Sequence, residues 1–245
     1  MSDIATALQP PAADRNLAAR LVGVVFSPGD TFRGIATRPR WLGAMAVVVA
    51  IVAGANFVLL STEVGQQALL DQQIRSAESW GRTLTDEQQD GMERMLPMMR
   101  YITLASTVVL APVITFALAG VLYAVFNAGL GGEARYRQVL AVLTHAGAIS
   151  ALGALFITPL SYARESLSGA TNLGVFLPFL DEGSLPARFL GMIDLFLIWW
   201  VVAVGIGLSV LYRRRTAPVV LSLLATYVAI AAIIAVVMRA FAGSQ

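Results

Sequence analysis

The sequence predicts an all-α integral membrane protein: a bundle of five transmembrane helices with a cytoplasmic N-terminus and an external C-terminus. Two observations predict this class. Apolar residues make up 57% of the chain and charged residues only 13%, whereas a typical soluble domain has about 25% charged residues. In addition, the arginines between the long apolar runs change sides in alternation, which sets the orientation of the bundle.

Five apolar runs are long enough to cross a bilayer. A helix rises ~1.5 Å per residue, so roughly 20 residues cover a hydrocarbon core ~30 Å thick. The expected spans are residues 41–60, 101–126, 139–160, 189–211 and 217–238. The third span is rich in small residues, which allow helix backbones to approach closely. We therefore expect it to lie at the centre of the bundle.

The arginine distribution gives the orientation, because basic residues near span ends stay on the cytoplasmic side. Segments with an excess of arginine are residues 1–40, the second-to-third link with Arg135 and Arg137, and the fourth-to-fifth link with Arg213, Arg214 and Arg215. Links 61–100 and 161–188 carry more acids than arginines. All 17 basic residues are arginines, a usage typical of a bacterial source. The expected location is the bacterial inner (plasma) membrane.

The chain divides into three expected parts. Residues 1–41 form a cytoplasmic N-terminal arm with amphipathic surface helices. Residues 42–238 form the five-span membrane domain, which includes an external helical hairpin at residues 61–100. Residues 239–245 form a short external tail.

Basic and aromatic residues are expected to hold the protein at the membrane surface. These anchors are Arg33, Arg38, Arg40 and Trp41 in the arm, and Arg213, Arg214 and Arg215 in the last link. Ser27 and Pro28 match the cap and first position of a surface helix. Phe32 and Ile35 are expected to enter the membrane beside Trp41. The alternative is that the arm is only a positively charged flank.

The external hairpin carries a helix-start signal and a group of methionines. Thr85 and Gln88 have the spacing of a capping box. The helix that follows carries Met92, Met95, Met98 and Met99. Their spacing favours packing of an amphipathic helix, although thioethers can also bind Cu(I).

Two ionisable residues lie well inside the expected spans, His145 and Asp194, and such residues are functional candidates. At ~1.5 Å per residue, Asn56 lies about 22 Å above the cytoplasmic side and Asp194 roughly 8 Å below the external side. In a ~30 Å core these depths nearly coincide. We therefore predict that Asn56 and Asp194 share a polar site between the first and fourth spans. The alternatives for Asp194 are a tie between helices and a site for a cation, proton or substrate.

His145 is a secondary polar candidate. Among small residues, its ring is expected to make an interhelical hydrogen bond rather than to bind a ligand. One histidine and no cysteine are too few for a transition-metal site, so we expect no metal and no cofactor.

No enzyme signature accompanies these residues. No serine or threonine stands in a glycine-flanked nucleophile motif, and Gly129, Gly131 and Gly132 lack the lysine of a phosphate loop. A net charge of +2 is too small for nucleic-acid binding. We expect a non-enzymatic protein.

Short motifs in a fixed order carry a resemblance to a known family. They are Ser27-Pro28, Thr31-Phe32, Arg38-Pro39-Arg40-Trp41, Gly131-Gly132, Tyr136-Arg137-Gln138, Asp194-Leu195-Phe196, Trp199 or Trp200, and Gly205. Over about residues 20–235 the chain resembles the Yip family of Ypt/Rab-interacting membrane proteins, specifically its bacterial branch. The resemblance implies five spans and a cytosolic N-terminus. Eukaryotic members resemble adaptors for Rab-type GTPases, but the short basic arm here argues against GTPase binding.

Three functions remain open from the sequence. The first is a membrane protein that organises lipids or partner proteins, with homo-oligomers included among the partners. The second is a small permease, or a lipid- or ion-handling protein, that uses Asn56 and Asp194. The third is a subunit whose spans dock into a larger complex.

Overall fold

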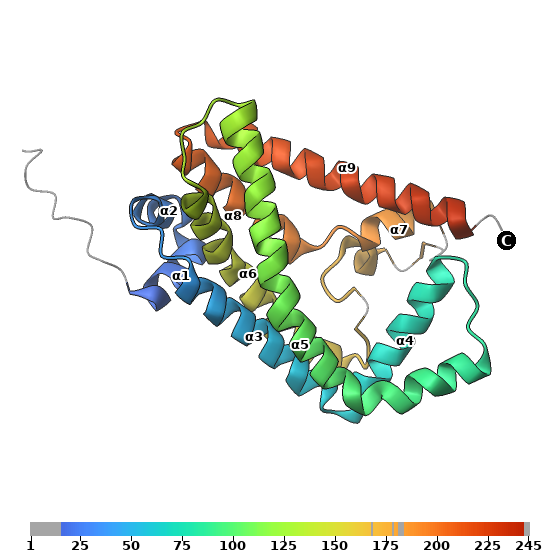
Figure 1. The fold of residues 1–245 in the computed structure, drawn as a ribbon. Helices are drawn as coiled ribbons and strands as arrows, with labels where there is room; N and C mark the ends of the chain where they lie inside the picture. The colour runs from blue at the N-terminus through green and yellow to red at the C-terminus, as the bar shows by residue number, and fades with distance from the viewer. Residues whose placement is uncertain (1–15, 168, 178, 181–183, 243–245) are drawn as a thin grey trace, which may run out of the picture.

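The computed structural model describes residues 16–167, 169–177, 179–180 and 184–242 (Figure 1). The α-helices are α1 Leu17–Phe26, α2 Pro28–Thr37, α3 Leu42–Leu60, α4 Glu63–Ser79, α5 Asp86–Ala124, α6 Tyr136–Ala163, α7 Leu185–Gly191, α8 Leu195–Leu211 and α9 Thr216–Ala242. A π-helical turn, η2 Val125–Gly129, extends α5, and a 3₁₀ turn, η3 Leu173–Phe176, precedes α7. Within these ranges no strand forms, and the all-α class is confirmed.

Four helices are long and apolar enough to cross a membrane in the described ranges: α3, α5 with its π turn, α6 and α9. The expected fourth span, 189–211, is divided in the structure. Helix α7 ends at Gly191, and α8 begins at Leu195 with Asp194 as its N-cap. The 17 residues of α8 are at the lower limit for a span, since ~1.5 Å per residue gives about 25 Å.

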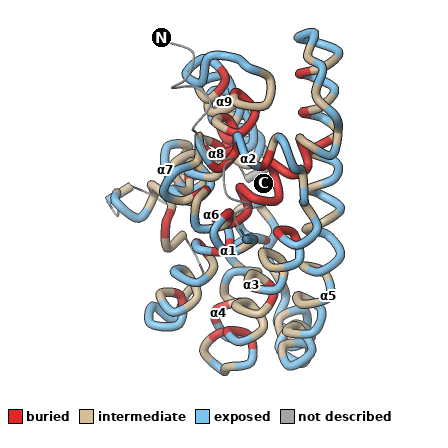
Figure 2. Tube along the Cα trace, turned by 90° about the vertical axis from the view of Figure 1, so that its left-hand side faces the viewer, coloured by how far each residue is buried: buried red, intermediate tan, exposed pale blue. Residues whose placement is uncertain are grey.

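Helix α6 lies at the centre, as its small residues predicted. In α6 56% of the most apolar stretch is buried, against 11%, 17% and 22% in α5, α9 and α3. A side chain at Gly147 would come within 3.1 Å of Val48, and one at Gly153 within 3.1 Å of Phe196. In Figure 2 buried segments gather where α2, α6 and α8 meet, whereas α5 is mostly exposed or half-buried.

The short helices α1 and α2 pack on α6 and α8 rather than lying apart from the bundle. Val24, Phe32 and Ile35 are fully buried in the core. The expectation that Phe32 and Ile35 enter the membrane is therefore wrong, because both side chains are enclosed by protein. Gly207 of α8 makes this packing possible, since a Cβ there would lie 3.1 Å from the Phe32 ring.

The hairpin after α3 consists of α4 and the first part of α5. The capping box of Thr85 and Gln88 is confirmed, with both reciprocal hydrogen bonds present. Helix α5 then runs for 39 residues without an end at the expected start of the second span. It bends on the way (Figure 1), and Pro97 in its interior removes a backbone donor. Arg188 of α7 donates to the Ser79 carbonyl at 2.7 Å and ties α7 to the end of α4.

Candidate functional site

Three arginine-bearing segments that are distant in sequence meet at one end of the bundle. Gln138 at the start of α6 donates to the Ala36 carbonyl of α2 at 2.8 Å. At the end of α8, Tyr212 donates to Asn127 of the π turn at 2.6 Å. These bonds join the arm, the α5–α6 turn and the α8–α9 turn, so the cationic side chains of all three share one end.

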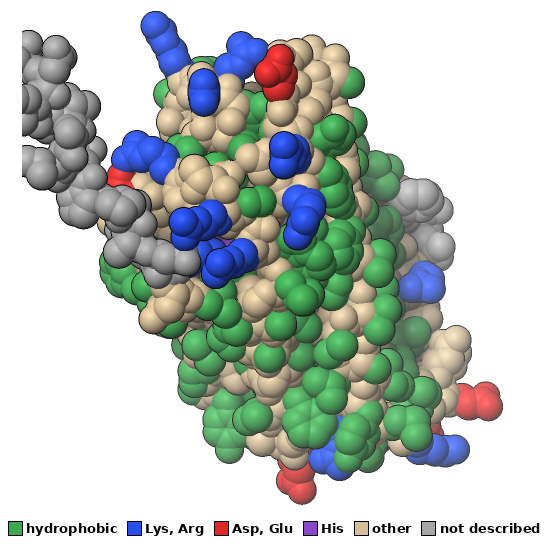
Figure 3. Space-filling model, turned by 60° about the vertical axis from the view of Figure 1, so that its left-hand side comes forward, with side chains coloured by type: hydrophobic (Ala, Val, Ile, Leu, Met, Phe, Trp, Pro, Cys, Tyr) green, Lys and Arg blue, Asp and Glu red, His purple; other side chains and the backbone are tan. Residues whose placement is uncertain are grey.

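We call this region the arginine-rich end. It comprises Arg33, Arg38, Arg40, Arg135, Arg137, Arg213, Arg214 and Arg215, all of them exposed. Within described residues 16–41, 125–138 and 209–218, the carboxylates are Asp30 and Glu133, and Asp30 forms an ion pair with Arg33. In Figure 3 cationic side chains gather over one end of the visible face, above a broad hydrophobic zone.

The α5–α6 turn is shaped by Asn127, which lies in the π turn. Its amide donates to the Ala134 carbonyl at 2.8 Å, and its side-chain oxygen accepts from Tyr212. The Tyr212 ring stacks on Phe126 with ring centroids 4.9 Å apart. Glycine is required at position 132, because a Cβ there would lie 2.5 Å from the Tyr212 ring. One aromatic side chain therefore holds two turns together.

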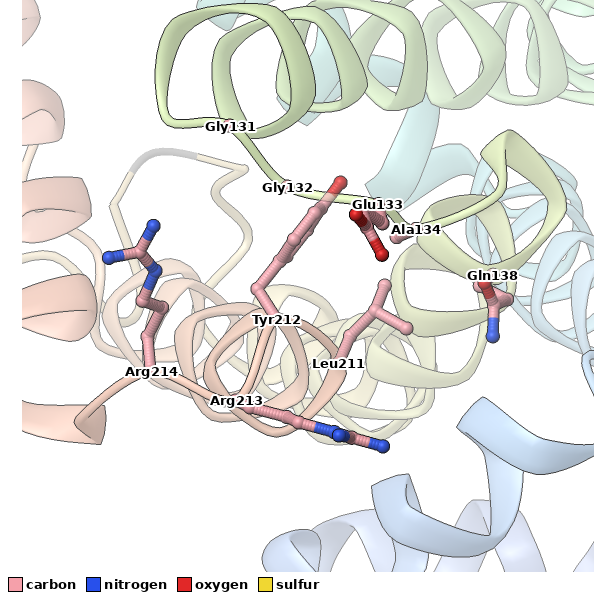
Figure 4. A pocket seen from close by; sticks show the side chains of 9 residues that line it. All are labelled: Gly131, Gly132, Glu133, Ala134, Gln138, Leu211, Tyr212, Arg213 and Arg214. Carbon is pink, nitrogen blue, oxygen red and sulfur yellow. The ribbon is translucent and has the colours of Figure 1, made fainter.

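A pocket of about 400 Å³ opens beside Tyr212 (Figure 4). It is lined by Gly131, Gly132, Glu133, Ala134, Gln138, Leu211, Tyr212, Arg213 and Arg214. Arg213 has a φ of 52°, uncommon for a side chain other than glycine, and Arg213 and Arg214 extend to opposite sides of the turn (Figure 4). Arg214 donates to the Leu130 carbonyl at 2.8 Å.

The phenol of Tyr212 stays neutral at physiological pH. Burial, with a smaller contribution from nearby Tyr123, raises the pKa of Tyr212 to about 12. The hydroxyl is therefore a permanent donor to Asn127 and a structural element of the turn. The charges beside the pocket come from arginines and Glu133, so this end can bind anions through guanidinium groups.

Among the predicted aromatic anchors, Trp41 packs partly on protein. Its ring meets the edge of Phe116 with centroids 5.5 Å apart, and the residue is half-buried. Tyr136 donates to the Phe116 carbonyl at 2.8 Å from the neighbouring helix. A membrane-surface role for Trp41 and the arginines stays a prediction.

At the opposite end of α8, Asp194 connects three segments. Its carboxylate accepts from the Thr171 hydroxyl and, at 3.0 Å, from the Leu197 amide, which caps α8. The Asp194 amide donates to the Tyr227 hydroxyl of α9 at 3.1 Å, and that hydroxyl donates to the Met192 carbonyl at 2.6 Å. We call Thr171, Met192, Asp194, Leu197 and Tyr227 the Asp194 junction. The carboxylate ties the loop after α6 to the start of α8, and the backbone amide of the same residue makes the bond to α9.

Asn56 is half-buried on α3 and is not among the partners of Asp194. The shared Asn56–Asp194 site stays a prediction. His145 is fully buried, and its Nδ1 donates to the Ala141 carbonyl at 2.8 Å. The expected interhelical bond is therefore wrong, because this bond lies within α6, and Nε2 has no partner in the described part of the chain.

Sequence reasoning missed the polar residues that fix both ends. Asn127 was a detectable signal, since it interrupts an apolar run just before a glycine-rich turn. Tyr212 carried no such signal, because tyrosines are common near membrane boundaries for reasons unrelated to helix ties. Tyr227 lies in the middle of the expected span 217–238, and the sequence does not show which distant group its hydroxyl meets. Thr171 lies in a loop without periodicity, so only the folded chain shows its bond to Asp194.

A model of the Yip1 domain matches residues 22–238. The chain belongs to the Yip1 domain family. No match was found among curated proteins or among solved structures. The Yip1 match begins within α1 and ends within α9, so α2, the hairpin and the junction lie inside it, together with the second half of α1.

Proposed function

We propose that this Yip1-domain protein is a non-enzymatic, five-span protein of the bacterial inner membrane that gathers anionic lipids at its arginine-rich end. In this arrangement the N-terminus and the arginine-rich end face the cytoplasm. The spans in chain order are α3, α5, α6, α8 and α9, so that α8 is the fourth. The observation that carries the proposal is the meeting of three arginine-bearing segments at one end.

Electrostatics supports this orientation and this lipid class. The cytoplasmic leaflet is rich in anionic lipids, and each arginine near such a surface contributes about 1 kcal/mol of attraction. The exposed arginines of this end far outnumber the two carboxylates beside them in the described segments. Residues 61–100, at the other end, contain more acids than arginines. The two membrane faces of the protein therefore differ in charge.

The length of α8 is enough for a membrane span only if the residues that flank the helix also reach the membrane interface. Its 17 residues fall at the short end of the range of ~17–25 residues seen for membrane helices. Short spans are accommodated by local thinning of the bilayer and by flanking residues that reach the interface. Arg213, Arg214 and Arg215 follow Tyr212, the C-cap of α8, and suit that role.

The permease alternative depends on Asp194. In the structure its carboxylate caps α8 and binds Thr171, and Asp194 is not among the residues that line the pocket beside Tyr212. A transport role for Asn56 and Asp194 remains the second candidate, and Asp194→Asn tests it below.

The lipid proposal is tested by purifying the full chain from bacterial membranes in mild detergent and measuring the phospholipids that accompany it. We expect anionic lipids to be enriched over the bulk membrane. Arg137→Gln with Arg213→Gln should reduce the enrichment, because two surface cations are removed. The matched control is Arg82→Gln with Arg94→Gln, which removes two exposed arginines from the hairpin end.

Two outcomes contradict the lipid proposal. One is a lipid composition in the purified protein equal to that of the bulk membrane. The other is an equal loss of enrichment in both double variants. If a second protein co-purifies in a fixed ratio with this chain while the lipid composition equals that of the bulk membrane, the result would instead favour the organisation of a protein partner.

A further inference from the structure

A second pocket lies across the α8–α9 turn from the one in Figure 4, and Arg214 lines both. It has a volume of about 380 Å³ and is lined by Phe126, Leu130, Arg214, Arg215, Pro218, Val219 and Ser222. Ligand pockets range from ~300 to 1,000 Å³. The space is therefore enough for a headgroup and the start of a chain, but not for a whole lipid.

The lining combines two cations with an apolar floor. Phe126, Leu130, Pro218 and Val219 supply the apolar part, and no carboxylate takes part in the lining. Leu130 is 52% exposed, so part of this floor faces outward. A pocket with both cationic and apolar lining suits a ligand that has an anionic group attached to a hydrocarbon chain.

The two arginines are available to an anion in different degrees. Arg214 uses one nitrogen to donate to the Leu130 carbonyl, which positions the guanidinium and leaves further N–H donors. Arg215 is exposed and has no hydrogen-bond or ion-pair partner within the described residues. Guanidinium groups bind phosphate oxygens through paired N–H donors.

The start of α9 adds to the positive potential. This helix begins at Thr216, directly after Arg215, and runs for 27 residues. The N-terminal end of a helix carries partial positive charge and unpaired amide groups. A phosphate between Arg214 and Arg215 would lie next to that end.

We propose that this pocket holds one anionic phospholipid, with its phosphate between Arg214 and Arg215 and the start of an acyl chain against Phe126, Leu130 and Val219. The inference rests on the proposed function, because it requires the arginine-rich end to lie at the membrane surface. It goes further in assigning a single specific site. Leu221 in the second turn of α9 is 64% exposed, so the rest of the lipid can extend along an apolar surface.

The test is native mass spectrometry of the delipidated, full-length protein titrated with phosphatidylglycerol. Phosphatidylcholine and inorganic phosphate are the comparison probes. We expect one tightly retained phosphatidylglycerol per protein and weaker retention of phosphatidylcholine. Inorganic phosphate at the same concentration should not displace the bound lipid, because it gains nothing from the apolar floor.

Two substitutions address the two halves of the pocket. Arg215→Gln should weaken phosphatidylglycerol binding on the order of fivefold, as expected for one arginine at an anionic group. Ser222→Phe keeps every arginine but fills the pocket with an aromatic ring, and it should weaken binding at least as much. The matched controls are Arg137→Gln, an exposed arginine outside the pocket, and Ser222→Ala, which leaves the pocket open.

The outcomes separate this inference from the proposed function. Equal weakening by Arg137→Gln and Arg215→Gln would overturn the site, while general enrichment of anionic lipid would leave the proposed function intact. Full binding by Ser222→Phe, or displacement of lipid by inorganic phosphate, would mean an anion site without an acyl chain and would also overturn it. Ser222 is exposed, and an unchanged melting temperature for Ser222→Phe establishes that lost binding comes from the filled pocket.

Discussion

The arginine-rich end and the Asp194 junction use charge in opposite ways. At the junction, the carboxylate of Asp194 is engaged by a hydroxyl and a helix amide. At the arginine-rich end, Arg137, Arg213 and Arg215 are exposed, and their guanidinium groups have no hydrogen-bond or ion-pair partner within the described residues. The difference teaches where to look for function: the Asp194 carboxylate accepts hydrogen bonds from within the fold, whereas the exposed cations remain available to bind a ligand.

Both regions nevertheless use a tyrosine hydroxyl as their internal tie. Tyr212 bonds to Asn127 across two turns, and Tyr227 bonds to Met192 and Asp194 across two segments. A phenol suits both positions, because its ring packs against apolar side chains while its hydroxyl reaches a buried polar group. The contrast between the two ends therefore lies in the charged residues and not in the way that the helices are joined.

The largest effect is expected in the core beneath the arginine-rich end. Phe32→Ala should lower the free energy of unfolding by about 3–5 kcal/mol, the usual cost of deleting a buried phenylalanine, because Phe32 is fully enclosed. Thermal unfolding in detergent measures it. The control is Phe26→Ala on α1, where the side chain is 80% exposed and the change should be within ~0.5 kcal/mol. Equal effects would mean that the arm does not pack as described.

The next effect concerns the junction. Asp194→Ala removes the cap of α8 and the partner of Thr171, and should cost about 0.5–2 kcal/mol. Asp194→Asn should cost less, because asparagine is also a good N-cap. Unfolding of both variants is compared with proton or ion uptake in proteoliposomes. Suppose that the native protein takes up protons or ions and that Asp194→Asn abolishes the uptake while stability is retained. This result would contradict a purely structural role for the Asp194 carboxylate and would favour the permease function.

The smallest effect is expected at the tie of the arginine-rich end. Tyr212→Phe keeps the ring stack but removes the hydroxyl that donates to Asn127, and should cost about 0.5–1.5 kcal/mol. The control is Tyr123→Phe on the neighbouring helix, because the Tyr123 hydroxyl makes no hydrogen bond within the described residues. A similar loss of stability in both variants would argue against the Tyr212–Asn127 bond.

The same variant has a signature in pH. The pKa of the Tyr212 phenol is raised from 10.0 to about 12 in the folded protein, so the unfolded chain loses this proton first. Linkage then requires native stability to fall as pH rises from about 10 to about 12. Tyr212→Phe should lack this part of the fall, and unfolding measured across that range checks it.

Much of the architecture was predictable, because a membrane helix can be recognised in a sequence by the length and composition of its apolar run. The all-α class, the central place of the small-residue helix at 139–160, and the capping box at Thr85 and Gln88 are confirmed. These features depend on neighbours in sequence or on a single helix surface. The expected run at 189–211 was wrong in detail, because hydropathy alone does not register that Asp194 can end one helix and cap the next.

The candidate site was predicted only in part. The charge pattern predicted which arginines belong on one side, including Arg213, Arg214 and Arg215. It did not predict that Phe32 and Ile35 are buried in the protein core. The sequence pattern of an amphipathic helix is the same whether its apolar face contacts lipid or protein. The partners of Asp194 were also hidden, because Thr171 and Tyr227 are distant in sequence.

The sequence by itself determined the membrane setting, the helical class and the grouping of the arginines at one end of the bundle, because these follow from hydrocarbon thickness and from charge at helix ends. The tertiary structure decided which polar groups meet: Tyr212 with Asn127, and Asp194 with Thr171. It also decided that Arg214 and Arg215 border an apolar pocket. Such meetings depend on the packing of distant helices around α6, and close packing is a property of the whole fold that no local pattern records.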